Sequence, residues 1–406
     1  MTPNSFTGSP FAPERLVYLD HAATTPVRPE VREAMLPFLG GGGEAFGNPS
    51  SPHRFGRAAR AGIEQARRAI AAALDADPNQ VIFTSGGTEA DNLAVIGAAL
   101  AARSRGRPFR VAVSAIEHKA VLAAAQFVAD LGGEMLTLPV DHGGLVDPAG
   151  VLEACARGAA LISVMWVNNE IGVLEPIREL ARATREAGPD VAFHSDAVQA
   201  LGKVPVAFRE SGCALLSISG HKIGAPKGVG ALLVRDRRAV MPLLHGGGQQ
   251  FALRPGTENV PGIVALGKAV ELAVRERAEL ALRLAALRDQ LERGIVAAVP
   301  DAVVHAARSP RAPQTLSVSI PGIDSEAMLM HLDMAGIACS SGSACSTGAV
   351  EPSHVLSAMG VPHDLGVATL RFSFGRENTA EDVDTVLATL PRIVEKVRGL
   401  TAELRR

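Results

Sequence analysis

The chain has 406 residues, a formal net charge of −2 and a hydrophobic content of 47% with few aromatic residues. This length exceeds the size at which a single hydrophobic core stops growing, so we expect two domains with cores of Ala, Val, Leu and Ile. The balanced charge argues against binding to nucleic acid or to a membrane surface, and the basic residues of helical segments such as 57–70 are expected to be solvated.

The first sixteen residues contain no basic segment followed by an apolar run, and no apolar stretch reaches the ~20 residues of a membrane span. We therefore expect a soluble, cytoplasmic protein. The sequence contains no C-x-x-C pair and no histidine at zinc-ligand spacing from its cysteines, which are Cys155, Cys213, Cys339 and Cys345. In a reducing compartment a buried thiol is the default for a cysteine, and we expect it for three of these four.

Short β-branched runs alternate with helical patterns between residues 50 and 235. The predicted strands lie within 80–86, 109–118, 160–170, 191–200 and 214–222, and the predicted helices cover 87–103, 119–133 and 175–188. Near-continuous apolar strands separated by amphipathic helices are typical of βαβ units. We therefore predict an α/β fold around a mostly parallel sheet that is covered on both faces.

The second half of the chain begins with a helical pattern over 263–299 that contains no turn signal, and we predict that it leads to a second domain. Strands near 314–320 and 368–374 and a helix from Ala380 then predict a small α+β unit. The predicted domains are a large one over 28–262 and a small one made of 1–27 and 263–406.

Polar side chains stand at the carboxyl ends of the predicted strands. They are Ser85 to Thr88, His118, Asn168 and Asn169, Asp196, and His221 and Lys222. Because ligands of open α/β sheets bind beyond this edge of the sheet, the polar set predicts one binding site.

The segment 84–92, TSGGTEADN, joins a strand to a helix through a pair of glycines that precede Thr88. Free backbone N–H groups and a hydroxyl in such a turn suit an anion. The glycine spacing differs from both nucleotide-binding patterns, which favours a single phosphate group. An ordinary glycine turn with Thr88 as the helix cap is the alternative.

Two charged residues at other strand ends extend this interpretation. Asp196 ends an apolar strand, where a buried carboxylate needs a partner such as a protonated pyridine nitrogen; capping of the next helix is the alternative. Lys222 stands in an apolar setting that disfavours its charged form and makes its amine nucleophilic. A phosphate cradle, a carboxylate for a ring nitrogen and a reactive lysine together predict pyridoxal 5'-phosphate as the cofactor.

The order and spacing of these motifs resemble the cysteine desulfurases of the class-V aminotransferase family, and the likeness extends from residue 17 to residue 379. The matching segments are TSGGTEADNLA, EHKAVL, VNNEIGVLEPI, SDAVQALGK, SGHKIGAPKGVGALLV, LRPGTENV and SSGSACSTGAVEPSHVL. The resemblance implies the type I fold of pyridoxal-phosphate-dependent transferases. It also implies removal of sulfur from L-cysteine, which gives L-alanine and an enzyme persulfide.

The resemblance further implies roles for single residues. Lys222 corresponds to the Schiff-base lysine, whereas Lys227 is expected to be structural. The residues expected to bind the cofactor are Gly87, Thr88, His118, Asn169, Asp196, Gln199, Ser219, His221, Lys222 and Thr257.

His118 is expected to stack on the pyridine ring and to carry a proton, with a buried structural histidine as the alternative. Asn169 and Gln199 are expected to contact the substrate and the phenolic oxygen of the ring. Thr257 is expected to reach the cofactor phosphate of a neighbouring subunit, which implies a homodimer. Arg371 is expected to hold the substrate carboxylate together with Asn169, and its alternative is a strand-surface arginine.

Residues 338–354 are rich in Ser, Gly and Ala, which anchor a loop poorly, so we expect a mobile loop. By resemblance Cys345 is the nucleophile that forms the persulfide, in the group with the longer catalytic loop, and a transient ligand of an iron–sulfur cluster. Cys339 follows apolar Ile337 and Ala338 and is expected to be a structural thiol.

Other functions are compatible with the same motifs. A selenocysteine lyase or a related pyridoxal-phosphate lyase is one alternative, and a non-catalytic sulfur-transfer scaffold is another. An iron–sulfur scaffold protein is the default sulfur acceptor, but other acceptor proteins would be served by the same chemistry.

Overall fold

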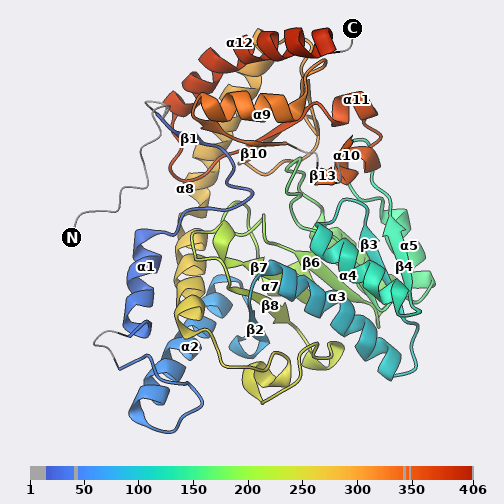
Figure 1. Cartoon of the computed structure of the whole chain (residues 1–406). Helices are drawn as coiled ribbons and strands as arrows, with labels where there is room; N and C mark the ends of the chain where they lie inside the picture. Colours follow the sequence, from blue (N-terminus) through green and yellow to red (C-terminus); the bar gives the residue numbers. More distant parts are fainter. Residues whose placement is uncertain (1–14, 41–43, 342–343, 347–348, 405–406) are drawn as a thin grey trace.

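The computed structural model describes residues 15–40, 44–341, 344–346 and 349–404. A sheet of seven strands forms the centre of the larger part of the molecule (Figure 1). In spatial order its strands are β2 (Val81–Thr84), β8 (Gly230–Val234), β7 (Leu215–Ser219), β6 (Ala192–Asp196), β5 (Leu161–Ser163), β3 (Arg110–Ser114) and β4 (Glu134–Leu138).

Five neighbouring strands of this sheet, from β4 to β7, are parallel, whereas β8 runs antiparallel to both β7 and β2. The predicted mostly parallel sheet is therefore confirmed. The exception follows from the connection: only residues 220–229 separate β7 from β8, which is too short for a crossover to a parallel neighbour. That connection carries His221 and Lys222.

Helices cover both faces of the sheet, as predicted. Val111 and Val113 of β3 pack against the helices of one face, and Ala112 between them packs against those of the other. The first face carries α3 (Gly87–Ser104) and α4 (Lys119–Asp130). The second carries α1 (Pro29–Met35), α2 (Arg54–Ala73), α5 (Pro148–Ala156), α6 (Ile177–Ala187), α7 (Phe208–Ser211) and the first part of α8 (Val260–Ala298).

Helix α8 connects two hydrophobic cores. Its first part, up to Ala273, packs into the core beside the large sheet, and its second part, from Leu284 to Ile295, packs into a separate core. The helix predicted over 263–299 is thus confirmed within a few residues. In Figure 1 it runs from the lower to the upper part of the molecule.

The second core lies around a small antiparallel sheet. Its strand order is β12 (Ser340–Ser341), β15 (Thr369–Ser373), β10 (Thr315–Ser319) and β9 (Val303–Val304). Helices α9 (Ser325–Met334) and α12 (Ala380–Leu404) cover it, and the short helices α10 (His354–Ala358) and α11 (His363–Gly366) precede β15. The strands predicted near 314–320 and 368–374 and the closing helix from Ala380 are confirmed.

The N-terminal segment links the two parts of the molecule. Strand β1 (Val17–Tyr18) pairs in parallel with β11 (Ile337–Ala338) beside the small sheet. The chain then crosses to the large sheet, where the Thr25 N–H donates to the His221 carbonyl at 2.9 Å. No helix among the described residues combines the length and the apolar character needed to cross a membrane.

Candidate active site

A cavity of about 440 Å³ opens at the carboxyl ends of the parallel strands. Most of the residues predicted for the site line it, although they come from well-separated parts of the chain. The lining residues are Ala22, Ala23, Gly87, Thr88, Asp91, His118, Met165, Asn169, Asp196, Val198, Gln199, Ser219, His221, Lys222 and Arg371.

One end of the cavity is the start of helix α3. The first turn of a helix leaves backbone N–H groups without intrahelical partners, and these favour an anion. Gly87 keeps this end open, because a Cβ atom there would lie 3.0 Å from Val198 Cγ2 and 3.4 Å from Ser219 Cβ. The cap position is Gly86, so Thr88 is not the helix cap that the alternative interpretation required.

Asp196 ends β6 and is 5% exposed. Its Oδ1 accepts a hydrogen bond from the Val198 N–H at 2.8 Å, so it caps the following turn and lines the cavity at once. Burial raises the pKa of this carboxyl group, while His118 and Lys222 oppose the rise. A cationic partner in the cavity would stabilise the carboxylate further.

Lys222 lies in the turn Gly220–Lys222 that follows β7. Its Nζ donates to the carbonyl oxygens of Ala22 at 2.5 Å and Ala23 at 2.7 Å. Burial and then the charge of Arg371 lower the pKa of its amine to about 8. A substantial fraction of this amine is therefore neutral, and nucleophilic, near physiological pH.

His118 caps helix α4, and its Nδ1 accepts from the Ala120 N–H at 3.1 Å. Burial lowers the pKa of the imidazole. A neutral ring that accepts through Nδ1 carries its proton on Nε2. This ring can therefore exchange a proton with a group in the cavity.

Arg371 lies on β15 of the small sheet and reaches into the cavity. Its Nη2 contacts Asp20 Oδ1 at 2.7 Å and its Nη1 donates to the Asn169 carbonyl at 3.0 Å. The side chain is buried, so the alternative of a strand-surface arginine is wrong. Its Nε has no hydrogen-bond partner among the described residues, which leaves a donor for a further acceptor.

Gln199 and His221 contact the N-terminal segment. Gln199 Nε2 donates to the Ala22 carbonyl at 2.9 Å, and His221 Nδ1 lies 3.2 Å from Thr24 Oγ1. Burial, followed by the charge of Lys222, lowers the pKa of His221 to about 4, so its ring is neutral. The N-terminal segment thus forms one wall of the cavity.

Thr257 does not line this cavity, and for Cys345 the structure gives the backbone alone. Thr257 is exposed on the loop after Arg254, whose Nε contacts Glu89 Oε1 of helix α3 at 2.8 Å. The side chain of Cys345 lies outside the described part of the structure, as do residues 342–343 and 347–348, so the predicted loop mobility stays a prediction. The backbone of Cys345 pairs with Val350 between strands β13 (Ala344–Ser346) and β14 (Ala349–Glu351).

Cys339 follows strand β11 and is half-buried. Burial and the nearby Asp20 carboxylate raise the pKa of its thiol to about 12. A thiol with this pKa is protonated at neutral pH and is a poor nucleophile. The preference for Cys345 over Cys339 as nucleophile is consistent with this environment.

Sequence reasoning missed several lining groups. Ala22 and Ala23 contribute backbone carbonyls, which no side-chain pattern can reveal. Asp20 was not singled out, although it lies in the matching segment VYLDHAATTP. Met165 and Val198 are apolar residues of the cavity wall. The sequence indicated them only through their position within three residues of Asn168 and Asp196.

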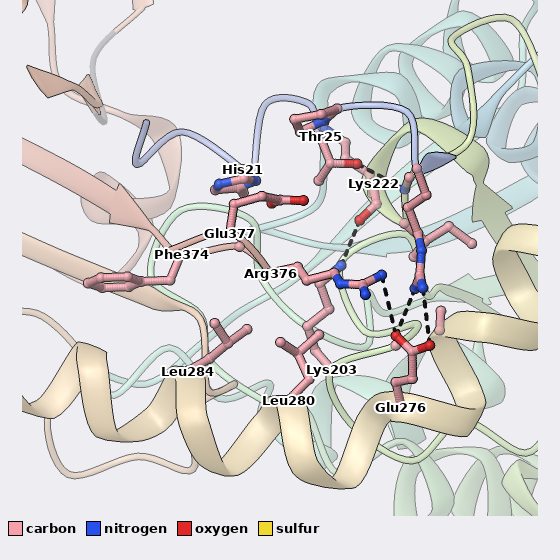
Figure 2. Close-up of a pocket in the computed structure, with 17 residues that line it drawn as sticks. His21, Thr25, Lys203, Lys222, Glu276, Leu280, Leu284, Phe374, Arg376 and Glu377 are labelled. Atoms are coloured by element: carbon pink, nitrogen blue, oxygen red, sulfur yellow. Dashed lines mark hydrogen bonds and ion pairs between the residues drawn. The ribbon is translucent and has the colours of Figure 1, made fainter. Parts of the chain in front are cut away.

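A second cavity of about 60 Å³ lies on the other side of Lys222, between helix α8 and the turn after β15 (Figure 2). Lys203 lines it and donates from Nζ to the Lys222 carbonyl at 2.7 Å. Burial, and then the charge of Lys222, lower the pKa of the Lys203 amine to about 8. Lys203 thus holds the backbone of Lys222 from the side of the second cavity. An ion pair at 2.9 Å between Arg28 and Glu276 forms another part of the wall of that cavity.

The chemistry of the main cavity fits pyridoxal 5'-phosphate. An open glycine cradle at a helix start suits its phosphate, and the buried carboxyl of Asp196 suits its ring nitrogen. The amine of Lys222, with its lowered pKa, suits its aldehyde. Among the described residues no group of three His, Cys, Asp or Glu side chains is arranged to hold a metal ion.

Comparison with known proteins agrees with this geometry. Residues 17–386 match the model of the family described as Aminotransferase class-V. The chain is 47% identical over 388 residues to cysteine desulfurase IscS of Dictyoglomus turgidum, an alignment that covers 96% of this chain and 97% of that protein. It is 42% identical over 386 residues to cysteine desulfurase NifS of Azotobacter vinelandii, with 95% and 94% covered.

Solved structures agree as well. The structure titled NifS-like protein superposes with a TM-score of 0.85 at 33% identity, over 96% of this chain and 100% of that one. A NifS-like protein from Rickettsia africae gives a TM-score of 0.83 at 31% identity, over 94% and 100%. The chain therefore belongs to the class-V aminotransferase family, among its pyridoxal-phosphate-dependent cysteine desulfurases.

Proposed function

We propose that this chain removes sulfur from L-cysteine, releases L-alanine and retains the sulfur as a persulfide on Cys345. The observation that carries the proposal is the single cavity that gathers Asp196, Lys222, His118 and Arg371 from both parts of the molecule. The names of the relatives, cysteine desulfurase IscS and NifS, support the same activity.

The residues proposed to hold pyridoxal phosphate follow from the chemistry of each group. Gly87, Thr88, Ser219 and His221 would hold the phosphate, Asp196 the ring nitrogen, His118 the ring face, Asn169 and Gln199 the phenolic oxygen, and Lys222 the aldehyde carbon. When bound, the cofactor withdraws the electrons that are left on the substrate carbon after loss of its proton.

The protein side chains perform the remaining steps. Arg371 holds the substrate carboxylate with its guanidinium group, and Asn169 supports it. The Lys222 amine takes the proton from the α-carbon, and His118 exchanges a proton with the substrate thiol. Cys345, as a thiolate, bonds to the substrate sulfur while the bond between that sulfur and the β-carbon breaks; the β-carbon takes a proton and becomes the methyl group of alanine.

The assembly and the partners belong to the same proposal. We propose a homodimer in which Thr257 reaches the cofactor phosphate of the neighbouring subunit; this is supported by the exposure of Thr257 and by its absence from the lining of its own chain's described cavity. The sulfur acceptor is proposed to be an iron–sulfur scaffold protein in the cytoplasm, with Cys345 as a transient ligand of the cluster during handover.

The domain division is also proposed. The two cores joined by helix α8 support a large domain over 28–262 and a small domain made of 1–27 and 263–406. In this division Arg371 belongs to the small domain and Lys222 to the large one. Cysteine would then bind between the two domains.

The decisive experiment is incubation of the cofactor-loaded protein with L-cysteine, followed by measurement of alanine and of persulfide by mass spectrometry. Cys345→Ser should bind cofactor and cysteine but release no alanine, because a hydroxyl group is not deprotonated at the pH at which a thiol is. Cys339→Ser is the matched control and should retain turnover. Persulfide that persists in Cys345→Ser and disappears in Cys339→Ser would reverse the assignment.

A further inference from the structure

Buried polar side chains from helix α3, the loop before α4 and strands β5 to β7 form a layer at the base of the cofactor cavity, where Asp91 and Asp196 reach its lining. The proposed mechanism uses none of them except Asp196. The other members are 0% or 1% exposed and are Asp91, Glu117, Ser163, His194 and Ser217. Buried polar groups on this scale are costly unless each has a partner.

The contacts within the layer form a continuous chain. Ser163 Oγ lies 3.4 Å from Glu117 Oε2 and 2.9 Å from His194 Nδ1. On its other side, His194 Nε2 lies 2.9 Å from Ser217 Oγ and 3.7 Å from Asp91 Oδ1. The imidazole therefore joins two hydroxyl groups, of which Ser163 contacts Glu117 and Ser217 forms a hydrogen bond with the Asp91 carboxyl group.

The histidine in the middle of the chain is uncharged, since burial lowers its pKa to about 3. A neutral imidazole has one nitrogen that donates and one that accepts. If Nδ1 donates to Ser163, that hydroxyl can donate onward to Glu117, while Ser217 donates to Nε2. If instead Nε2 donates to Ser217, each of the two hydroxyl groups donates in the opposite direction, so that Ser163 donates to Nδ1.

The carboxyl groups of the layer lack cationic partners. No Lys or Arg side chain among the described residues forms an ion pair with Glu117 or Asp91. The Glu117 Oε1 accepts only from the Met165 N–H, at 2.5 Å, and Asp91 Oδ1 has no hydrogen-bond partner in the described structure. Lys222 and His118 are the positive or ionisable groups nearby, and they act on Asp196.

The acidic groups also oppose one another's ionisation. Burial, and then the charge of Asp196, raise the pKa of both Asp91 and Glu117 well above the ordinary range. Glu175 adds a further unfavourable charge beside Glu117, and the His354 ring contacts only the Glu117 carbonyl, at 2.9 Å. Three carboxylates in one buried layer are not all ionised when only Asp196 faces cations.

We propose that the chain from Glu117 through Ser163, His194 and Ser217 to Asp91 is uncharged and hydrogen-bonded throughout. Both of its carboxyl groups are protonated, and Asp196 is the only carboxylate that this layer presents to the cofactor ring. The chain residues are positioning residues: they keep competing negative charge away from the ring nitrogen. This inference rests on the proposed role of Asp196.

Infrared spectroscopy tests the charge assignment directly, because a protonated buried carboxyl group has a C=O stretch that a carboxylate lacks. We expect the full-length protein at pH 7 to show bands of this kind, one lost in Asp91→Asn and one lost in Glu117→Gln. Glu175 is the internal control: burial raises its pKa to about 8, so its band should fade as the pH passes that value. The absence of any such band at pH 7, or bands that both variants retain, would overturn the proposal.

Cofactor affinity provides the second measurement. An amide of the same shape replaces a neutral acid, so Glu117→Gln should change the dissociation constant of pyridoxal phosphate by less than about threefold. Asp196→Asn removes a charged partner and should weaken binding by about 10- to 150-fold. If Asp196→Asn binds pyridoxal phosphate normally while the infrared bands behave as expected, the proposed role of Asp196 is wrong. The proposal that the series of side chains from Glu117 to Asp91 is uncharged is then retained. If Glu117→Gln weakens binding as much as Asp196→Asn, Glu117 is a carboxylate and the uncharged series of side chains is disproved.

Discussion

Lys222 and Lys227 lie five residues apart, yet their surroundings differ completely. Lys222 lies between the two cavities, with its amine on the carbonyls of Ala22 and Ala23, whereas Lys227 is exposed in the following loop. Composition does not distinguish these two lysines. The difference lies in where the turn after β7 places each backbone.

Lys222→Ala should therefore lose the visible absorption band of the covalently bound cofactor together with all turnover, because Lys222 is the only lysine among the described residues that line the cavity. Lys227→Ala should keep both. Spectra of the two purified variants in the presence of pyridoxal phosphate make the comparison. A normal spectrum in Lys222→Ala would show that another lysine binds the cofactor.

The lowered pKa of Lys222 predicts a particular pH dependence in the cofactor-free protein. Only the neutral amine reacts with an electrophile, and burial places the pKa at about 8 instead of 10.5. The rate at which an amine reagent labels Lys222 should rise through pH 7 and level off above about 8, as followed by peptide mass spectrometry. A rate that keeps rising up to pH 10 would show that the lysine is not perturbed.

Arg371 carries a prediction about the substrate. In Arg371→Lys an ammonium replaces the planar fork, so the contact to the substrate carboxylate loses about 1.5–3 kcal/mol, or roughly 10- to 150-fold in cysteine affinity. Cofactor affinity should change far less. Arg376→Lys, at a half-exposed arginine in the turn after the same strand, is the control. Equal cysteine affinity in Arg371→Lys and the wild type would exclude the contact.

Regular elements were predictable where the periodicity was long or uninterrupted. The alternation of apolar strands and helices predicted the parallel sheet, and α8 was found within a few residues of its limits. The N-terminal segment was not predictable in the same way. Its strand has two residues, and its pairing of Val17 with Ile337 depends on a partner more than three hundred residues away.

The candidate site, like the fold, was predictable only in part. Glycines, Asp196 and Lys222 were found because each performs its task with a side chain at a strand end. Backbone carbonyls of Ala22 and Ala23 carry no side-chain signal, and β8 was not among the predicted strands. His194 is not among the residues that line the cavity and follows the apolar residues 191–193, so only the fold reveals its contacts.

At the level of elements, the packing of α8 against α2 depends on a glycine. A Cβ atom at Gly267 would lie 2.7 Å from Ala66 Cβ and 2.8 Å from Ala66 Cα, so the two helices must separate to admit a side chain. Gly267→Val should destabilise the fold by about 1–3 kcal/mol. Gly399→Ala, at an exposed position of α12 with no atom within 4 Å, should stabilise it by roughly 0.5–1 kcal/mol.

Thermal unfolding of the two glycine variants and the wild type, at equal cofactor saturation, measures both changes. We expect opposite shifts of the midpoint. Equal midpoints for Gly267→Val and the wild type would mean that the close approach of α2 and α8 is not maintained in solution.

On the scale of the whole molecule, the site draws on distant parts of the chain. The N-terminal segment supplies Asp20 and the carbonyls, the large sheet supplies Lys222 and Asp196, and the small sheet supplies Arg371. The two cores share helix α8 and the N-terminal segment as connections. A change in their relative position would therefore alter the distance between Arg371 and Lys222, and with it the space for substrate.

The proposed dimer extends this argument to a second chain and gives the last prediction. If Thr257 serves the neighbouring subunit, a mixed dimer of Lys222→Ala and Thr257→Ala chains contains one complete site, since the second chain keeps Lys222 and receives Thr257 from the first. If Thr257 serves its own chain, neither site is complete. Losing one hydrogen bond to a phosphate should weaken cofactor binding by about 10- to 150-fold. Differently tagged chains, purified as mixed dimers and titrated with pyridoxal phosphate, should therefore show half the wild-type number of covalent sites at wild-type affinity. Half the sites at the affinity of the Thr257→Ala homodimer would place Thr257 in its own chain's site, and failure to recover any mixed species would contradict the dimer itself.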